Sequence, residues 1–159
     1  MHLGMLLQMA ADGAPDRIAF GPRTGGATMA DFSARARRAG TLFADRPGQR
    51  VAVVDLNSEA IPIALFGAAL AGKPLVPINY RLADAQLRAI VARTAPALVI
   101  AGAGVAERLG HIEGIEVMTR AELLDAVLDE SLEQADPYAG DPDGIAVLLY
   151  TSGTTGLPK

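Results

Sequence analysis

The sequence predicts an α/β fold with a mostly parallel sheet flanked by helices. From residue 50 onward, short runs rich in β-branched residues alternate with longer segments of helical periodicity, the order expected of β-α-β units. The runs VAVV at 51–54 and IAVLLY at 145–150 contain no alternating polar residues, which is typical of strands buried on both faces. A chain of 159 residues is long enough for one hydrophobic core.

The composition excludes several classes of protein. With 50% hydrophobic and 20% charged residues, the chain is a typical globular sequence and disorder is not expected. It has no cysteine, and its two histidines, His2 and His111, stand far apart. Disulfides and thiolate metal sites are therefore excluded, and we expect no metal site. The basic residues are scattered and aromatics are few, so the sequence does not support nucleic-acid binding.

The cellular location of the protein is predicted from the lack of a secretory signal and of a membrane-spanning stretch. The N-terminal residues have no basic region ahead of an apolar run, so a secretory signal is not expected. The uncharged stretch at residues 60–72 is shorter than the roughly 20 residues that span a bilayer. We therefore expect a cytoplasmic protein without a transmembrane segment.

The net charge of −4 is unevenly distributed, because residues 113–143 hold ten acidic residues against Arg120 alone. We interpret this stretch as an acidic surface helix, with an interaction surface as the alternative.

Strands and helices can be placed from residue 50 onward. Thr119 and Glu122 form a capping-box pattern that predicts the start of a helix. A second helix is predicted over residues 58–71, capped by Asn57 or Ser58 and ended by Gly72, and a third over 84–94. The strands are predicted at residues 50–55, 75–78, 97–101, 115–117 and 145–150.

Three elements are predicted before residue 50. They are a short amphipathic helix over residues 1–11, a hairpin built from 17–20 and 27–29 around a turn with two glycines, and a helix. The helix places four apolar residues on one face: Phe32, Ala36, Ala39 and Phe43. Residues 134–144, with two prolines and two glycines, are expected to form a loop.

The last ten residues, YTSGTTGLPK, have the features of a phosphate-binding loop. The glycines can adopt positive φ and let backbone N–H groups turn inward, the hydroxyl groups can donate hydrogen bonds, and the lysine adds a positive charge. The spacing is not that of a Walker A loop, because Pro158 stands where that motif has a glycine. The candidate phosphate-binding residues are Thr151, Ser152, Gly153, Thr154, Thr155, Gly156 and Lys159.

The ordered string at 150–159 closely resembles the signature loop of the adenylate-forming, or AMP-binding, superfamily, which includes acyl-CoA synthetases, luciferases and peptide-synthetase adenylation domains. GAALAGKPLVPINYRL at 67–82 resembles a helix-to-strand passage of the same enzymes. NYRLADAQL at 79–87 looks more like acyl-CoA synthetases, or fatty-acid–CoA ligases, than like peptide synthetases. The chain departs from many members of this superfamily at Ala83, where a Ser or Thr would cap the next helix. Asp84 is expected to cap that helix instead.

The resemblance implies that residues 1–159 are the incomplete first part of a large N-terminal AMP-binding domain. That part would comprise an opening region at 1–49, alternating strands and helices at 50–150, and the phosphate loop at 151–159. It further implies a ligase that uses ATP with Mg²⁺ to convert a carboxylic acid to an acyl-adenylate, and then transfers the acyl group to coenzyme A. The catalytic, adenine-binding and magnesium-binding residues of the family would all lie beyond Lys159, so the isolated chain is expected to be inactive.

Three other interpretations remain open at this stage. The chain could belong to a peptide-synthetase-type adenylation domain. It could be a genuine short protein that keeps the loop as a nucleotide-binding or regulatory remnant. It could also be an interaction module in which the acidic region contacts a partner.

Overall fold

A four-stranded parallel sheet forms the centre of the computed structural model, which describes residues 2–150 of the chain. Its strand order is β4-β3-β5-β6. The central strand β3 pairs with β4 and β5, so that Val51 lies opposite Leu75 on one side and Leu98 on the other. The strands are β3 (Arg50–Val54), β4 (Leu75–Pro77), β5 (Ala97–Ala101) and β6 (Ile115–Thr119).

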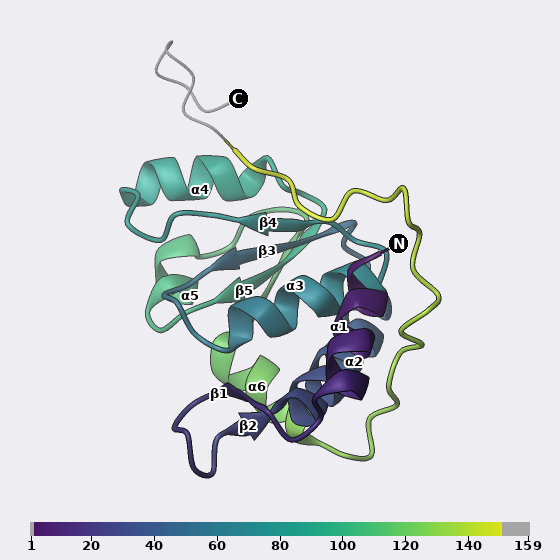
Figure 1. Cartoon of the computed structure of the whole chain (residues 1–159). Helices are drawn as coiled ribbons and strands as arrows, with labels where there is room; N and C mark the ends of the chain where they lie inside the picture. The colour runs from purple at the N-terminus through teal and green to yellow at the C-terminus, as the bar shows by residue number, and fades with distance from the viewer. Residues whose placement is uncertain (1, 151–159) are drawn as a thin grey trace.

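Helices cover both faces of this sheet (Figure 1). One face packs against α2 (Met29–Ala44), α3 (Ala60–Leu70) and α6 (Arg120–Leu128). The other packs against α4 (Asp84–Ala92) and the short α5 (Val105–Leu109). Because successive residues of a strand point to opposite faces, β5 contributes Leu98 to the first core and Val99 to the second. The predicted α/β fold with a mostly parallel, helix-flanked sheet is confirmed.

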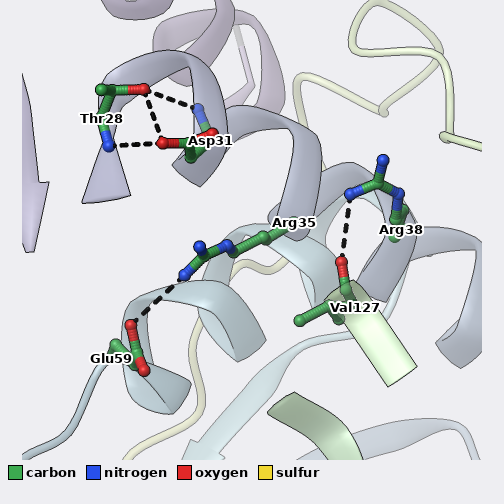
Figure 2. A network of polar contacts seen from close by, with 6 residues as sticks. All are labelled: Thr28, Asp31, Arg35, Arg38, Glu59 and Val127. Atoms are coloured by element: carbon green, nitrogen blue, oxygen red, sulfur yellow. Dashed lines mark hydrogen bonds and ion pairs between the residues drawn. The ribbon is translucent and has the colours of Figure 1, made fainter. Parts of the chain in front are cut away.

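The helices α2 and α3 pack closely because small residues face each other. A Cβ added to Gly67 would lie 2.6 Å from that of Ala39, so only glycine permits this approach. Charged side chains then join α2 to its neighbours, as Figure 2 shows. Arg35 pairs with Glu59 at 3.5 Å, just before α3, and Arg38 donates a hydrogen bond to the carbonyl of Val127 in α6 at 3.1 Å.

The N-terminal elements follow the prediction. The helix α1 (Leu3–Gly13) is followed by an antiparallel hairpin of β1 (Ile18–Phe20) and β2 (Ala27–Thr28). The four apolar residues predicted on one face of α2 are all buried. Two capping boxes are formed: Thr28 with Asp31 at α2, and the predicted pair Thr119 with Glu122 at α6.

Some local predictions are wrong. Ser58 does not cap α3, because its hydroxyl donates to the carboxylate of Asp55 and the helix begins at Ala60 without a side-chain cap. Asp84 does not cap α4; it lies in the first turn, where Arg108 binds its carboxylate. The helix α5 was not predicted. The acidic stretch contains a strand, a nine-residue helix and a loop in place of one surface helix.

The largest correction concerns residues 145–150, which were predicted to form a strand buried on both faces. The segment runs beside β4 but forms a single parallel bridge, Val147 with Leu75. The side chains of Ile145 and Leu149 are 64% and 69% exposed. The physical reason is that no described residue covers the outer edge or the second face of this segment, although its apolar run suits burial.

Candidate functional site

The predicted phosphate-binding residues 151–159 lie outside the described residues, and the structure shows the segment that leads to them. Tyr150, the last described residue, donates a hydrogen bond from its hydroxyl to the carbonyl of Arg93 at 3.3 Å. The guanidinium of Arg93 also lies 5.4 Å from the centre of the tyrosine ring, a cation–π distance. Leu148 and Tyr150 pack against the core beneath α4. The chain is therefore held to α4 immediately before the predicted loop.

The turn from β4 to α4 contains the distinctive residues Asn79, Tyr80 and Arg81. The side-chain oxygen of Asn79 accepts a hydrogen bond from the backbone N–H of Arg81 at 3.0 Å, which is an Asx turn. Arg108 of α5 donates to the carbonyls of Tyr80 and Leu82 at 2.8 and 2.5 Å. These contacts hold the turn between β4 and α4, and the sequence analysis did not predict the part that Arg108 plays in it.

An ion pair with a buried carboxylate lies at the carboxyl end of β3. The side chain of Asp55 is 2% exposed and accepts hydrogen bonds from the N–H of Leu56, the hydroxyl of Ser58 and the guanidinium of Arg120. A Cβ added to Gly102 would lie 2.9 Å from Cγ of Asp55 and closer still to its Oδ1. Asp55 thereby joins the ends of β3 and β5 to the start of α6.

The carboxyl ends of β3 and β5 also mark the point where the chain changes direction across the sheet. The strand β4, which follows β3 in the chain, lies on one side of β3, and the next strand, β5, lies on the other side. Open parallel sheets commonly bind ligands beside the carboxyl ends of such strands. Two hollows flank Arg120 here: one of about 560 Å³ reaches Phe20 and Leu124, and one of about 250 Å³ reaches Gly104. Asp55 could have been noticed in the sequence as a carboxylate directly after a buried strand, but its pairing with Arg120 has no sequence signal.

Lys73, in the passage that resembles the adenylate-forming enzymes, has a structural role. Its Nζ donates hydrogen bonds to the carbonyls of Phe43 and Arg46, each at 2.6 Å. These contacts satisfy backbone groups at and just after the C-terminal end of α2. Partial burial lowers the pKa of Lys73, against the opposing effect of Asp45 and Glu116.

The described residues offer no metal site and no membrane span. Among residues 2–150, no three His, Cys, Asp or Glu side chains gather closely enough to hold a metal ion. No helix in this part of the chain is both long and apolar enough to cross a bilayer.

Comparisons with known proteins identify the family. A family model described as "AMP-binding enzyme" matches residues 7–159, and the chain therefore belongs to the AMP-binding enzyme family. Feruloyl-CoA synthase from an Amycolatopsis species is 35% identical over 139 residues, which are 83% of this chain and 27% of that protein. Fumosorinone synthetase from Cordyceps fumosorosea is 33% identical over 114 residues, which are 70% of this chain and 3% of that protein.

Solved structures have the same fold. The inhibitor-bound N-terminal domain of FACL13 from Mycobacterium tuberculosis superposes with a TM-score of 0.82 at 26% identity, over 99% of this chain and 43% of that one. VinN with L-aspartate superposes with a TM-score of 0.85 at 26% identity, over 100% of this chain and 46% of that one. The chain thus spans less than half of each of these relatives and solved structures.

Proposed function

We propose that this chain is the phosphate-loop-bearing part of an ATP-dependent adenylate-forming ligase that joins a carboxylic acid to the thiol of coenzyme A. The observation that carries the proposal is the family match over residues 7–159, which includes the loop at 151–159. Membership of the family supports the use of ATP. The likeness to a feruloyl-CoA synthase and the pattern at 79–87 support coenzyme A as the acceptor.

In this reaction the carboxylate attacks the α-phosphorus of ATP, pyrophosphate leaves, and the thiol then displaces AMP from the acyl-adenylate. The loop is proposed to bind the β- and γ-phosphates with the backbone N–H groups around Gly153 and Gly156, the hydroxyls of Thr151, Ser152, Thr154 and Thr155, and the ammonium of Lys159. Such donors stabilise negative charge as pyrophosphate leaves. Phosphoryl chemistry of this kind depends chiefly on positioning and electrostatics.

The described residues contribute no magnesium ligand set, so no step is assigned to Mg²⁺ on this chain. A phosphate loop without an adenine site or catalytic residues has no route to turnover. We therefore propose that residues 1–159 alone form an incomplete AMP-binding domain that is catalytically inactive.

A second candidate is a peptide-synthetase-type or carrier-protein-dependent enzyme. The relatives include surfactin synthase subunit 1 from Bacillus subtilis, 27% identical over 136 residues, and a fatty acid–[acyl-carrier-protein] ligase from Streptomyces coeruleorubidus, 35% identical over 118 residues. The two candidates share adenylate formation and differ in the thiol acceptor.

The experiment begins with the product of the native gene, purified from its own cells and measured by intact mass. For a product much larger than 16.5 kDa, we expect ATP–pyrophosphate exchange that depends on a carboxylic acid. Addition of coenzyme A or of carrier protein then distinguishes the two acceptors.

Two loop variants test the assignment of the site. Lys159→Ala and Gly153→Val should each reduce exchange at least tenfold. Lys159→Ala removes a positive charge, and Gly153→Val places a side chain where the backbone N–H groups are proposed to face the phosphate. Arg23→Ala, which changes an exposed residue of the hairpin loop, is the matched control and should leave exchange unchanged. Wild-type activity that survives both loop variants would refute the site, whereas absence of acid-dependent exchange in the large wild-type product would refute the function.

A product of 16.5 kDa would instead direct the work to nucleotide binding. Loss of binding in both loop variants would then favour the remnant interpretation.

A further inference from the structure

The end of the described chain is attached to the rest of the molecule chiefly through the side chain of Tyr150. The N–H of Leu148 donates to the carbonyl of Leu75 at 2.8 Å, and no later backbone group is paired in the bonds between described residues. The side chain of Leu149 is 69% exposed. Tyr150 is half-buried against the core beneath α4, and Figure 1 shows this end of the chain beside that helix.

One residue, Arg93, holds both the hydroxyl and the ring of Tyr150. Arg93 follows the last turn of α4, and its carbonyl accepts the hydrogen bond of the tyrosine hydroxyl at 3.3 Å. The last carbonyls of a helix lack partners within the helix, so this bond satisfies a group that α4 leaves open. The guanidinium, 5.4 Å from the ring centre, is attracted to the π electrons of the ring. Tyr150 is thus fastened to the end of α4 by two separate interactions.

The end of α4 is a firm anchor, because it is tied to the central strand of the sheet. The N–H of Arg93 donates to the carbonyl of Ile90 at 3.1 Å. The next residue, Thr94, is 0% exposed. Arg50, the first residue of β3, donates to the carbonyl of Thr94 at 3.2 Å. The contacts of Arg93 therefore connect Tyr150 to the core of the sheet.

We propose that Arg93 is a positioning residue for the phosphate loop, because it holds Tyr150 and thereby fixes the backbone to which Thr151 is bonded. The inference rests on the proposed function, in which residues 151–159 bind the β- and γ-phosphates of ATP. A loop that binds through backbone N–H groups loses conformational entropy when it is ordered around its ligand. Fixing one end of the loop before binding reduces that loss. Arg93 acts through Tyr150 and does not itself touch the nucleotide.

The effect of Arg93 should be modest and confined to ligands that carry the β- and γ-phosphates. The free energy of an exposed cation–π contact corresponds to an about two- to fivefold change in a dissociation constant. We expect Arg93→Ala to raise the dissociation constants of ATP and of pyrophosphate by this factor. The dissociation constant of AMP, which lacks both phosphates, should not change.

The test is isothermal titration of the native gene product with ATP, pyrophosphate and AMP in the presence of Mg²⁺. Tyr150→Leu, which removes the ring and the hydroxyl, should weaken ATP and pyrophosphate binding at least as much as Arg93→Ala does. Arg93→Lys keeps a cation and should bind ATP within about twofold of the wild type. Arg88→Ala is the matched control, because Arg88 is an exposed arginine of the same helix whose guanidinium bonds to the carbonyl of His111 instead. Thermal unfolding by circular dichroism checks that each variant is folded.

A double variant distinguishes positioning from direct contact with the nucleotide. If Arg93 acts through Tyr150, Arg93→Ala should have no further effect on ATP binding once Tyr150→Leu is present. An equal effect of Arg93→Ala in both backgrounds, an unchanged dissociation constant of ATP, or a parallel rise for AMP would overturn the inference and leave the proposed function standing. A wild-type product that binds neither ATP nor pyrophosphate would overturn the proposed function, and this inference with it.

Discussion

At the scale of single residues, the contact between Gly102 and Asp55 is the clearest constraint on the carboxyl end of the sheet. We predict that Gly102→Ala destabilises the chain by about 1–3 kcal/mol, because the added methyl group would displace a buried carboxylate that holds three partners. Urea unfolding followed by circular dichroism measures the change.

Gly13→Ala is the matched control for that substitution. An added Cβ at Gly13, the last residue of α1, meets nothing within 4 Å. The exchange should therefore be neutral or stabilise the chain by up to about 1 kcal/mol. If both alanine variants lose the same free energy, the close approach at Asp55 is not the cause.

The ion pair itself can be tested by Arg120→Met. The variant leaves Asp55, 2% exposed, without its guanidinium partner, although the N–H of Leu56 and the hydroxyl of Ser58 remain. We expect a loss of about 1–3 kcal/mol, and a double-mutant cycle with Asp55→Asn should show coupling between the two sites. Additive effects would mean that the pair does not stabilise the fold.

At the scale of elements, the capping box of α2 makes a prediction about pH. The backbone N–H and the hydroxyl of Thr28 both donate hydrogen bonds to the carboxylate of Asp31. These bonds, the backbone one having the larger effect, lower the pKa of the Asp31 carboxyl below 3.8. The charged form is thus favoured in the folded state. The contribution of this charged carboxylate to the stability of the fold is complete above pH 3.8, and it is lost as the pH falls through the lower pKa that the carboxyl has in the folded state.

Asp31→Asn should therefore be less stable than the wild type at pH 5–7, and the difference should narrow below pH 3.8. Thr28→Ala, which removes the hydroxyl that caps the helix, should cost about 1 kcal/mol. A difference between wild type and Asp31→Asn that is constant from pH 7 to pH 2.5 would rule out this role of the carboxylate.

Elements were predictable from sequence where the signal was local. The capping box of Thr119 and Glu122 lies within four residues, and the strand Ala97–Ala101 was predicted with its observed bounds. The prediction failed at residues 145–150 because an apolar run indicates a preference for burial, whereas the neighbours that supply burial are a property of the tertiary structure. Ser58 shows the same limit, since a hydroxyl that suits a cap was bound by Asp55 instead.

At the scale of the whole molecule, two apolar cores share one sheet, and we expect them to unfold together. Leu98 and Val99 are adjacent in β5 but belong to opposite cores. Leu98→Ala should cost about 2–5 kcal/mol and Val99→Ala somewhat less, each by shifting the same single transition. Circular dichroism and tyrosine fluorescence should coincide throughout, and separate transitions would show that the cores are independent.

The candidate phosphate loop was predictable from ten consecutive residues, but the rest of the site region was not. Asp55 and Arg120 are 65 positions apart in the sequence, and Arg108 reaches back 28 positions to Tyr80. Contacts of this separation arise from the strand order, which no single segment encodes.

The central position of β3 affects how the chain emerges during synthesis. It is the first strand of the sheet to be made, yet its partners at Leu75 and Leu98 follow much later. At translation rates of about 5–20 residues per second, the 47 residues that separate Val51 from Leu98 take roughly 2–9 s to appear. Until Leu98 appears, at least one edge of this apolar strand is open on the nascent chain, so a cell that makes this protein must keep β3 from pairing with the wrong partner.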